Sequence, residues 1–99
     1  MEVVVGKSYG ERPYVALITG RDPQFGFARE FVRPIERSMS RSGATGTIYY
    51  DLTDGLYEVR SSYVWAGDKV WRTRDRIWLE VSGGQAKALS RAEVLARLA

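Results

Sequence analysis

The chain contains no cysteine and no histidine among its 99 residues, and only three of its fifteen basic residues are lysine. The lack of cysteine excludes disulfides and thiolate metal sites. The lack of histidine removes the commonest general base and the commonest metal ligand. We therefore expect a protein that is not an enzyme and that holds no cofactor or metal, although chemistry based on carboxylates alone stays open.

Long apolar runs are also missing. No segment approaches the roughly 18 apolar residues that a membrane span requires. The N-terminal MEVVVGK has no basic lead followed by a long apolar stretch, so we expect no signal peptide, no membrane partner and a cytoplasmic location. The apolar share of 44% and charged share of 27% indicate a globular chain. Its length and the lack of repeats or linkers predict a single domain over residues 1–99.

Segments rich in β-branched residues predict strands at 2–6 and 14–20, which the turn residues between them join as a hairpin. Three more strands are predicted at 46–52, 56–66 and 70–81. Asp54-Gly55 is a strong tight-turn signal between the first two of these three strands. A second turn around residues 66–69 leads into the last one.

Two helices complete the predicted fold. Residues 22–43 have a capping Asp22, a Pro23 suited to the first turn and an apolar stripe at helical spacing, with a kink expected at Pro34. A short helix follows Ser90, which forms a capping box with Glu93. The sequence therefore predicts an α+β fold: a mostly antiparallel sheet of about five strands, with one helix packed on a face and a short C-terminal helix. The apolar side of the C-terminal helix must pack on the domain or on a second copy, so a homo-oligomer is one arrangement to test.

Alternation along the strands decides which way the arginines of KVWRTRDRIWLEV, residues 69–81, point. A strict two-residue turn at Gly67-Asp68 pairs Trp65 with Val70 and puts the arginines of 70–81 on the apolar face of 56–66. A three-residue loop or one bulge shifts the register by one and aligns the apolar faces, which burial favours. We therefore predict the shifted register, with Trp71 in the core and Arg60 roughly opposite Arg76.

The outer face of the predicted sheet then combines cations with aromatic rings, which is what single-stranded nucleic acid binding requires. Its predicted binding residues are Tyr49, Arg60, Arg72, Arg74, Arg76 and Trp78. A second basic surface is predicted on the helix over 22–43, with Arg29, Arg33 and Arg37. We expect sequence-tolerant binding of single-stranded DNA or RNA.

Each of these features also has a purely structural interpretation. The strand arginines can pair with Glu58, Asp75 and Glu80, while the C-terminal helix covers Trp78. The helix arginines can form local ion pairs on a solvated surface. A second function is a small protein-interaction or assembly module that uses exposed aromatics and the C-terminal helix. A third is a nuclease based on Asp51 and Asp54, although the turn explains Asp54 without chemistry.

The run GTIYYDLTDGLYEVR…VWRTRDRIWLEVSGG, followed by LSRAEVLARL, resembles the archaeal ThermoDBP family of small single-stranded DNA-binding proteins. The resemblance covers roughly residues 20–98 and rests on the order of elements and on composition. It implies helices combined with an antiparallel sheet, and binding through the strand residues named above. The composition, rich in arginine and free of cysteine, also suits a thermophile. The long C-terminal leucine zipper of the larger members is missing, which leaves other oligomeric arrangements open.

Overall fold

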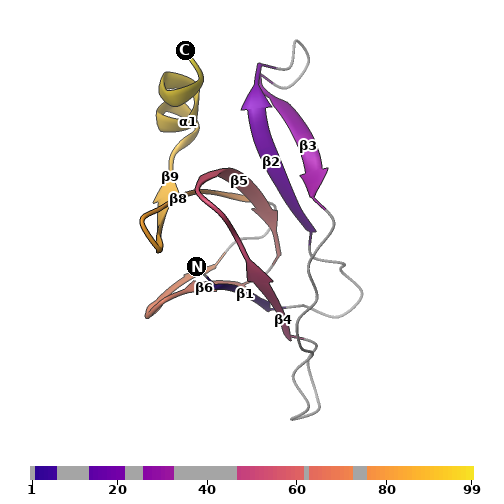
Figure 1. The fold of residues 1–99 in the computed structure, drawn as a ribbon, viewed down its shortest axis with the longest axis vertical. Helices are drawn as coiled ribbons and strands as arrows, with labels where there is room; N and C mark the ends of the chain where they lie inside the picture. Colours follow the sequence, from indigo (N-terminus) through magenta and orange to yellow (C-terminus); the bar gives the residue numbers. More distant parts are fainter. Residues whose placement is uncertain (1, 7–13, 22–25, 33–46, 62, 73–75) are drawn as a thin grey trace.

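The structure is a computed structural model that describes residues 2–6, 14–21, 26–32, 47–61, 63–72 and 76–99, with the backbone alone for 28–32 and 47–49. The described segments form a series of strands that ends in a C-terminal helix (Figure 1). The elements are β1 (Glu2–Gly6), β2 (Tyr14–Gly20), β3 (Ala28–Val32), β4 (Thr47–Asp51), β5 (Gly55–Arg60), β6 (Tyr63–Ala66), β7 (Lys69–Arg72), β8 (Ile77–Ser82), β9 (Gln85–Leu89) and α1 (Arg91–Leu98).

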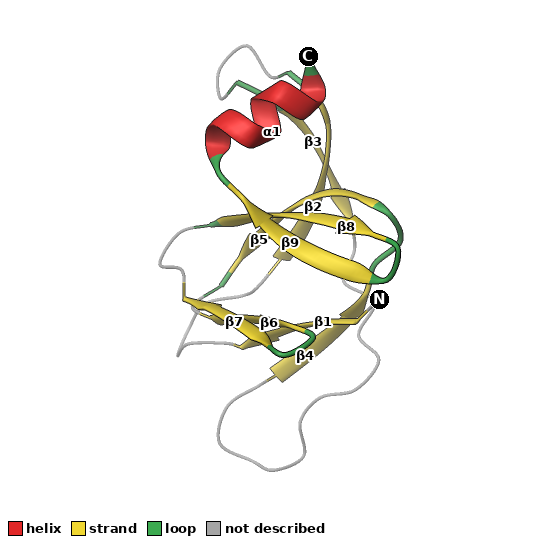
Figure 2. Cartoon of the chain, turned by 90° about the vertical axis from the view of Figure 1, so that its left-hand side faces the viewer, coloured by secondary structure: helices red, strands yellow, loops and turns green. Residues whose placement is uncertain are grey.

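The strands form two antiparallel sheets. Sheet A has the order β4-β1-β6-β7, and sheet B has the order β3-β2-β5-β8-β9. Figure 2 shows sheet A below sheet B and α1 above sheet B, so the chain is arranged in three layers. The prediction of a mostly antiparallel protein with a short C-terminal helix is confirmed, whereas the prediction of one sheet of about five strands is wrong.

The main core lies between the two sheets. Alternate residues of each strand point into it, as the two-residue period of a strand requires. Its buried members are Val3, Val5, Val15, Tyr50, Leu52, Tyr57, Val59, Val64, Ala66, Leu79 and Val81. Trp71 is half-buried and packs against this core, on the side that the sequence predicts for it.

One long hairpin passes from sheet B into sheet A and changes register on the way. Its base pairs β5 with β8, with Val59 opposite Ile77, and its tip pairs β6 with β7, with Tyr63 opposite Arg72. Between these two pairs one strand has three residues, 60–62, and the other has four, 73–76. One extra residue in one strand bends a hairpin, as at a β-bulge.

The two registers considered for this hairpin therefore coexist. The predicted shifted register is confirmed in the base, where Tyr57 pairs with Leu79 inside the core. It is wrong in the tip, where Gly67-Asp68 forms a strict two-residue turn and Trp65 pairs with Val70. The single strands predicted over 56–66 and 70–81 are each divided between the two sheets.

Two predicted hairpins are wrong because their strands lie in different sheets. β1 pairs with β4 and β6 in sheet A, whereas β2 pairs with β3 and β5 in sheet B. Asp54-Gly55 likewise joins β4 of sheet A to β5 of sheet B. The Tyr57 hydroxyl donates to the Thr53 carbonyl at 2.8 Å and ties this crossover to sheet B.

The helix predicted over 22–43 is wrong for residues 28–32, which form strand β3 along the edge of sheet B. Gly26 has a φ of 95°, a backbone conformation that a right-handed helix through this position excludes. Residues 22–25 and 33–43 of the predicted helix, including Pro34, lie outside the described residues. The face-covering helix is instead α1.

Helix α1 begins at the predicted capping box, with Glu93 N–H donating to Ser90 Oγ at 3.2 Å and Ser90 N–H donating to Glu93 Oε1 at 3.1 Å. The hydrogen bond from the Ser90 backbone lowers the pKa of Glu93. Val94 is fully buried, and it joins a second cluster on the outer side of sheet B with Ile18, Phe27 and Leu89. The apolar side of α1 thus packs on its own domain.

We predict that Ser61→Ala weakens the bend of the hairpin. The Ser61 hydroxyl is buried and donates to the carbonyl of Gly6, which joins the bend to β1. Loss of this bond should lower the free energy of unfolding by about 1 kcal/mol, measured by urea denaturation. The exposed Ser82 provides the control, and equal stability of Ser61→Ala and Ser82→Ala would show that the bond contributes nothing.

Candidate nucleic-acid interface

An aromatic and cationic surface lies on the outer side of sheet A. We call it the stacking face and define it as Tyr63, Trp65, Val70 and Arg72. The rings of Tyr63 and Trp65 are stacked, with centroids 5.8 Å apart and planes 24° apart. Arg72 Cζ lies 5.7 Å from the centroid of the Tyr63 ring, within cation–π range.

The stacking face points outward because the opposite side of β6 is occupied by the core. Val64 and Ala66 are buried between the sheets, so the alternate residues Tyr63 and Trp65 point away from them. Tyr63 is 38% exposed and Val70 is 51% exposed. Large apolar side chains that are this exposed and lie on one small area indicate a surface for a ligand or a partner.

The Trp65 ring packs against the backbone of Gly6. Gly6 is buried and pairs with Tyr63 across the β1–β6 ladder. A Cβ atom at Gly6 would lie only 2.6 Å from Cζ3 of Trp65. The absence of a side chain therefore allows the indole to lie close to the backbone of β1.

A buried carboxylate organises a second group of residues on the outer side of sheet B. Glu58 is fully buried, and its carboxylate accepts hydrogen bonds from the Tyr14 hydroxyl at 3.1 Å and from Trp78 Nε1 at 3.2 Å. Arg76 Nη1 lies 3.7 Å from the same carboxylate. Burying a charge is strongly unfavourable unless it is paired and hydrogen-bonded, and Glu58 meets both conditions.

Arg60 lies beside this group. It pairs with Tyr14 across the β2–β5 ladder, and its Cζ lies 5.8 Å from the centroid of the Tyr14 ring. The β5–β8 register pairs Val59 with Ile77, so continuing it by one residue sets Arg60 opposite Arg76. The juxtaposition of these two arginines stays a prediction, because the paired residues end at Val59 and Ile77.

Trp78 belongs to the packing of sheet B rather than to an open face. It is half-buried, meets Phe27 edge to face at a centroid distance of 5.6 Å, and packs against the cluster that contains Val94. Its indole N–H is bound to Glu58. The structural interpretation of this strand, with arginine paired to Glu58 and Trp78 beneath the C-terminal helix, is the one that the packing supports.

The predicted single binding face is thus divided. Arg60, Arg76 and Trp78 come together on sheet B, whereas Arg72 lies on sheet A. The backbone of Tyr49 pairs with Val4, and that of Arg29 pairs with Ile18. Arg33, Arg37 and Arg74 lie outside the described residues.

Sequence reasoning missed five residues of these two groups: Tyr63, Trp65, Val70, Tyr14 and Glu58. Alternation along an unbroken strand 56–66 places Tyr63 and Trp65 on the same apolar face as Tyr57 and Val59. The burial pattern reverses at the bend, which an unbroken strand cannot do. The available signal is Ser61-Ser62, a pair of small polar residues that interrupts the alternation of LYEVR with YVWA. Nothing in the sequence indicated that Tyr14 and Glu58 meet.

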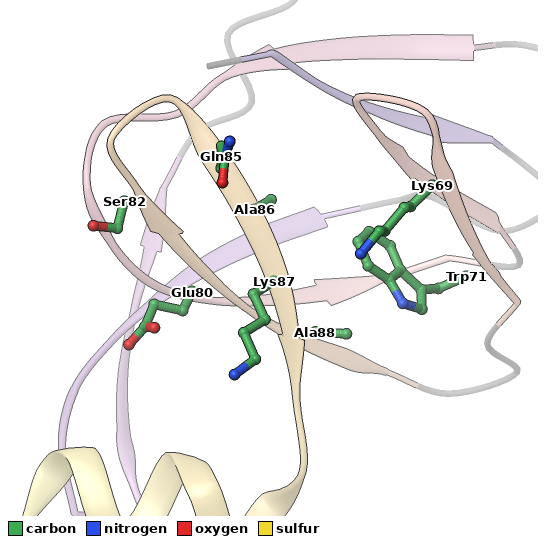
Figure 3. Close-up of a pocket in the computed structure, with 8 residues that line it drawn as sticks. All are labelled: Lys69, Trp71, Glu80, Ser82, Gln85, Ala86, Lys87 and Ala88. Atoms are coloured by element: carbon green, nitrogen blue, oxygen red, sulfur yellow. The ribbon is translucent and has the colours of Figure 1, made fainter.

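A groove of about 560 Å³ lies between the edge strands β7 and β9 (Figure 3). Its lining residues are Lys69, Trp71, Glu80, Ser82, Gln85, Ala86, Lys87 and Ala88. Figure 3 shows Trp71 and Ala88 on one side of β9 and Lys87 and Glu80 on the other. Its two lysines therefore do not converge on one point, and Glu80 is already paired with Arg97.

The described residues include no group of three or more acidic side chains that could hold a metal ion. Asp51 and Asp54 are therefore not part of such a group within the described part of the chain. No helix among the described residues is long and apolar enough to cross a membrane.

Comparison of the chain with protein-family models, with curated proteins and with solved structures found no match. The resemblance to the ThermoDBP family stays a prediction.

Two of the three tryptophans, Trp65 and Trp78, offer a matched test of these assignments. Trp78→Ala removes a ring from the second cluster and one hydrogen bond from buried Glu58, and it should lower the free energy of unfolding by about 3 kcal/mol. Trp65→Ala removes a ring from the outer surface and should change stability by less than about 1 kcal/mol. Thermal and urea denaturation would measure both, and the reverse order of stabilities would show that the two faces are exchanged.

A further variant tests the packing of the Trp65 ring against Gly6. Gly6→Ala should displace the indole, because its new methyl group occupies the space of the ring edge. Near-ultraviolet circular dichroism should report loss of the Tyr63–Trp65 stack, with the far-ultraviolet spectrum retained. An unchanged aromatic spectrum would mean that the ring does not lie against Gly6.

Proposed function

We propose that the chain binds single-stranded nucleic acid without strong sequence preference, through the stacking face of sheet A. The observation that carries this proposal is the stack of exposed Tyr63 on half-buried Trp65, with Arg72 over the Tyr63 ring. Aromatic rings accept bases of any sequence, and arginine offers a forked donor to a phosphate. DNA and RNA both provide bases and phosphates. A cytoplasmic location stays a prediction of the sequence.

The expected binding energies of the aromatic and cationic contacts suit this function. Stacking of a base on an aromatic side chain contributes roughly 1–3 kcal/mol. Each phosphate contact adds a term that weakens as salt rises, with a slope of about 0.7 per contact for single strands. Double-stranded nucleic acid hides its base faces inside the stack, so an outward-facing ring pair selects single strands.

A second function, a protein-interaction module, is favoured by one observation. Val70 and Tyr63 are the large apolar side chains recorded as exposed among the described residues, and both lie on the stacking face. The part of this hypothesis that uses the C-terminal helix loses support, because Val94 is fully buried against sheet B. Any such partner would therefore bind the same face as the nucleic acid.

Titration of labelled single- and double-stranded oligonucleotides at two salt concentrations tests the proposal. We expect the single strand to bind more tightly and its affinity to fall as salt rises. Arg72→Ala should flatten the salt slope by about one phosphate contact. Arg21→Ala, which removes an exposed arginine outside the stacking face, is the matched control.

Three outcomes are informative. Equal affinity for both forms, or no binding, would contradict the proposal. Equal slopes for Arg72→Ala and the unaltered protein would remove Arg72 from the interface. Capture of a protein partner with an affinity that barely responds to salt, combined with no nucleic acid binding, would favour the interaction module instead.

A further inference from the structure

We infer that Arg60 and Arg76 together form a phosphodiester site on the outer side of sheet B, and that buried Glu58 is its positioning residue. This inference deepens the proposed function and rests on it. It assigns a second contact to the bound nucleic acid strand. This contact lies on the other side of the hairpin bend from the stacking face. It also assigns Trp78 to the support of the site rather than to base stacking.

The two guanidinium groups come from neighbouring strands. Continuing the β5–β8 register one residue past the pair Val59–Ile77 sets Arg60 opposite Arg76, and the β2–β5 register pairs Tyr14 with Arg60. Arg60 is exposed, and the Arg76 side chain is 33% exposed. Both cations can therefore meet a ligand in solvent, whereas the Glu58 carboxylate, at 0% exposure, cannot.

The buried Glu58 carboxylate orients the residues around it. Its two oxygens accept from Tyr14 and Trp78, and one of them lies 3.7 Å from Arg76. A guanidinium carries five N–H donors, so Arg76 can face Glu58 and still direct other donors outward. Ordering a guanidinium before the ligand arrives reduces the entropy lost on binding.

The local charge indicates which phosphate the site suits. Two arginines opposite each other repel, and, counted over the described residues of this group, Glu58 offsets one of their two charges. The remaining charge of about +1 matches a phosphodiester within a strand. A terminal phosphate carries about −1.5 to −2 and would stay partly uncompensated. The ligand we assign is therefore an internal phosphodiester.

The site lies close enough to the stacking face to share one strand. Arg60 and Tyr63 are three residues apart, so their Cα atoms are separated by at most about 11 Å. Arg60 follows inward-pointing Val59, and Tyr63 precedes inward-pointing Val64, so both point away from the core. A nucleic acid strand that stacks on Tyr63 can continue around the bend to Arg60.

The first test uses unphosphorylated single-stranded oligonucleotides of graded length against Arg60→Ala and Arg76→Ala, with Arg21→Ala as control. We expect each of the first two variants to lose affinity about tenfold and to lower the salt slope by about one contact, with longer oligonucleotides losing more than the shortest. Arg76→Lys should restore the slope but not the affinity, because lysine keeps the charge and loses the fork.

The positioning role of Glu58 has its own readout. If Glu58 only offsets charge, Glu58→Gln raises the local positive charge and should strengthen binding. If it positions Arg76, Glu58→Gln should weaken binding despite the added positive charge, and this is the result we expect. Tyr14→Phe removes one donor to Glu58 while keeping the ring beside Arg60, and it serves if Glu58→Gln fails to fold. Weaker binding at an unchanged salt slope supports the positioning role.

The outcomes separate this inference from the proposed function. Full binding by Arg60→Ala and Arg76→Ala, with binding lost in Tyr63→Ala and Trp65→Ala, would overturn the phosphodiester site and leave the stacking face in place. The opposite pattern would overturn the stacking face and retain the anion site. A gain of affinity from a 5′-phosphate that disappears in Arg60→Ala would replace the internal phosphodiester with a terminal phosphate.

Discussion

The one-residue offset in the long hairpin determines the rest of this architecture. Three residues on one strand stand against four on the other between the pairs Tyr63–Arg72 and Val59–Ile77. The offset lets the hairpin leave sheet B and enter sheet A with apolar side chains inward on both sides of the bend. It also reverses which alternate side chains of one strand point inward. Val59 and Val64 therefore both face the core although they are an odd number of residues apart. The outward position of Tyr63 follows directly.

The buried Glu58 is a second constraint of the same kind. A carboxylate at 0% exposure destabilises the fold unless donors surround it, and here a tyrosine, a tryptophan and an arginine do so. Removing any one of them leaves part of a charge without a partner. The cluster therefore keeps three elements, β2, β5 and the start of β8, in one register.

The sequence was sufficient wherever a signal is local. The strand segments at β1, β2 and β4 and the capping box of α1 depend on neighbouring residues, and all are confirmed. Asp54-Gly55 shows the limit, since its tight-turn signal describes local geometry and does not decide whether the flanking strands pair. The apolar spacing of 28–32 fits a helix, but the positive φ of Gly26 and pairing with β2 make it a strand. The prediction of the candidate site was wrong for a related reason. It extended the in–out alternation of side chains across a bend, and the offset at that bend depends on residues far apart in sequence.

The space inside the sandwich explains why two large rings remain outside. Trp71 pairs with Val64 and packs against the main core, so the inward side of the β6–β7 tip already holds an indole. The inward residues of β6 are correspondingly small, Val64 and Ala66. Interiors are close-packed, so a second indole at either position would force the sheets apart. Trp65 therefore lies on the outer surface, where Gly6 leaves room for it beside Tyr63. The outward position of this aromatic pair is thus a consequence of how the core is filled, and it places Tyr63 next to Arg72.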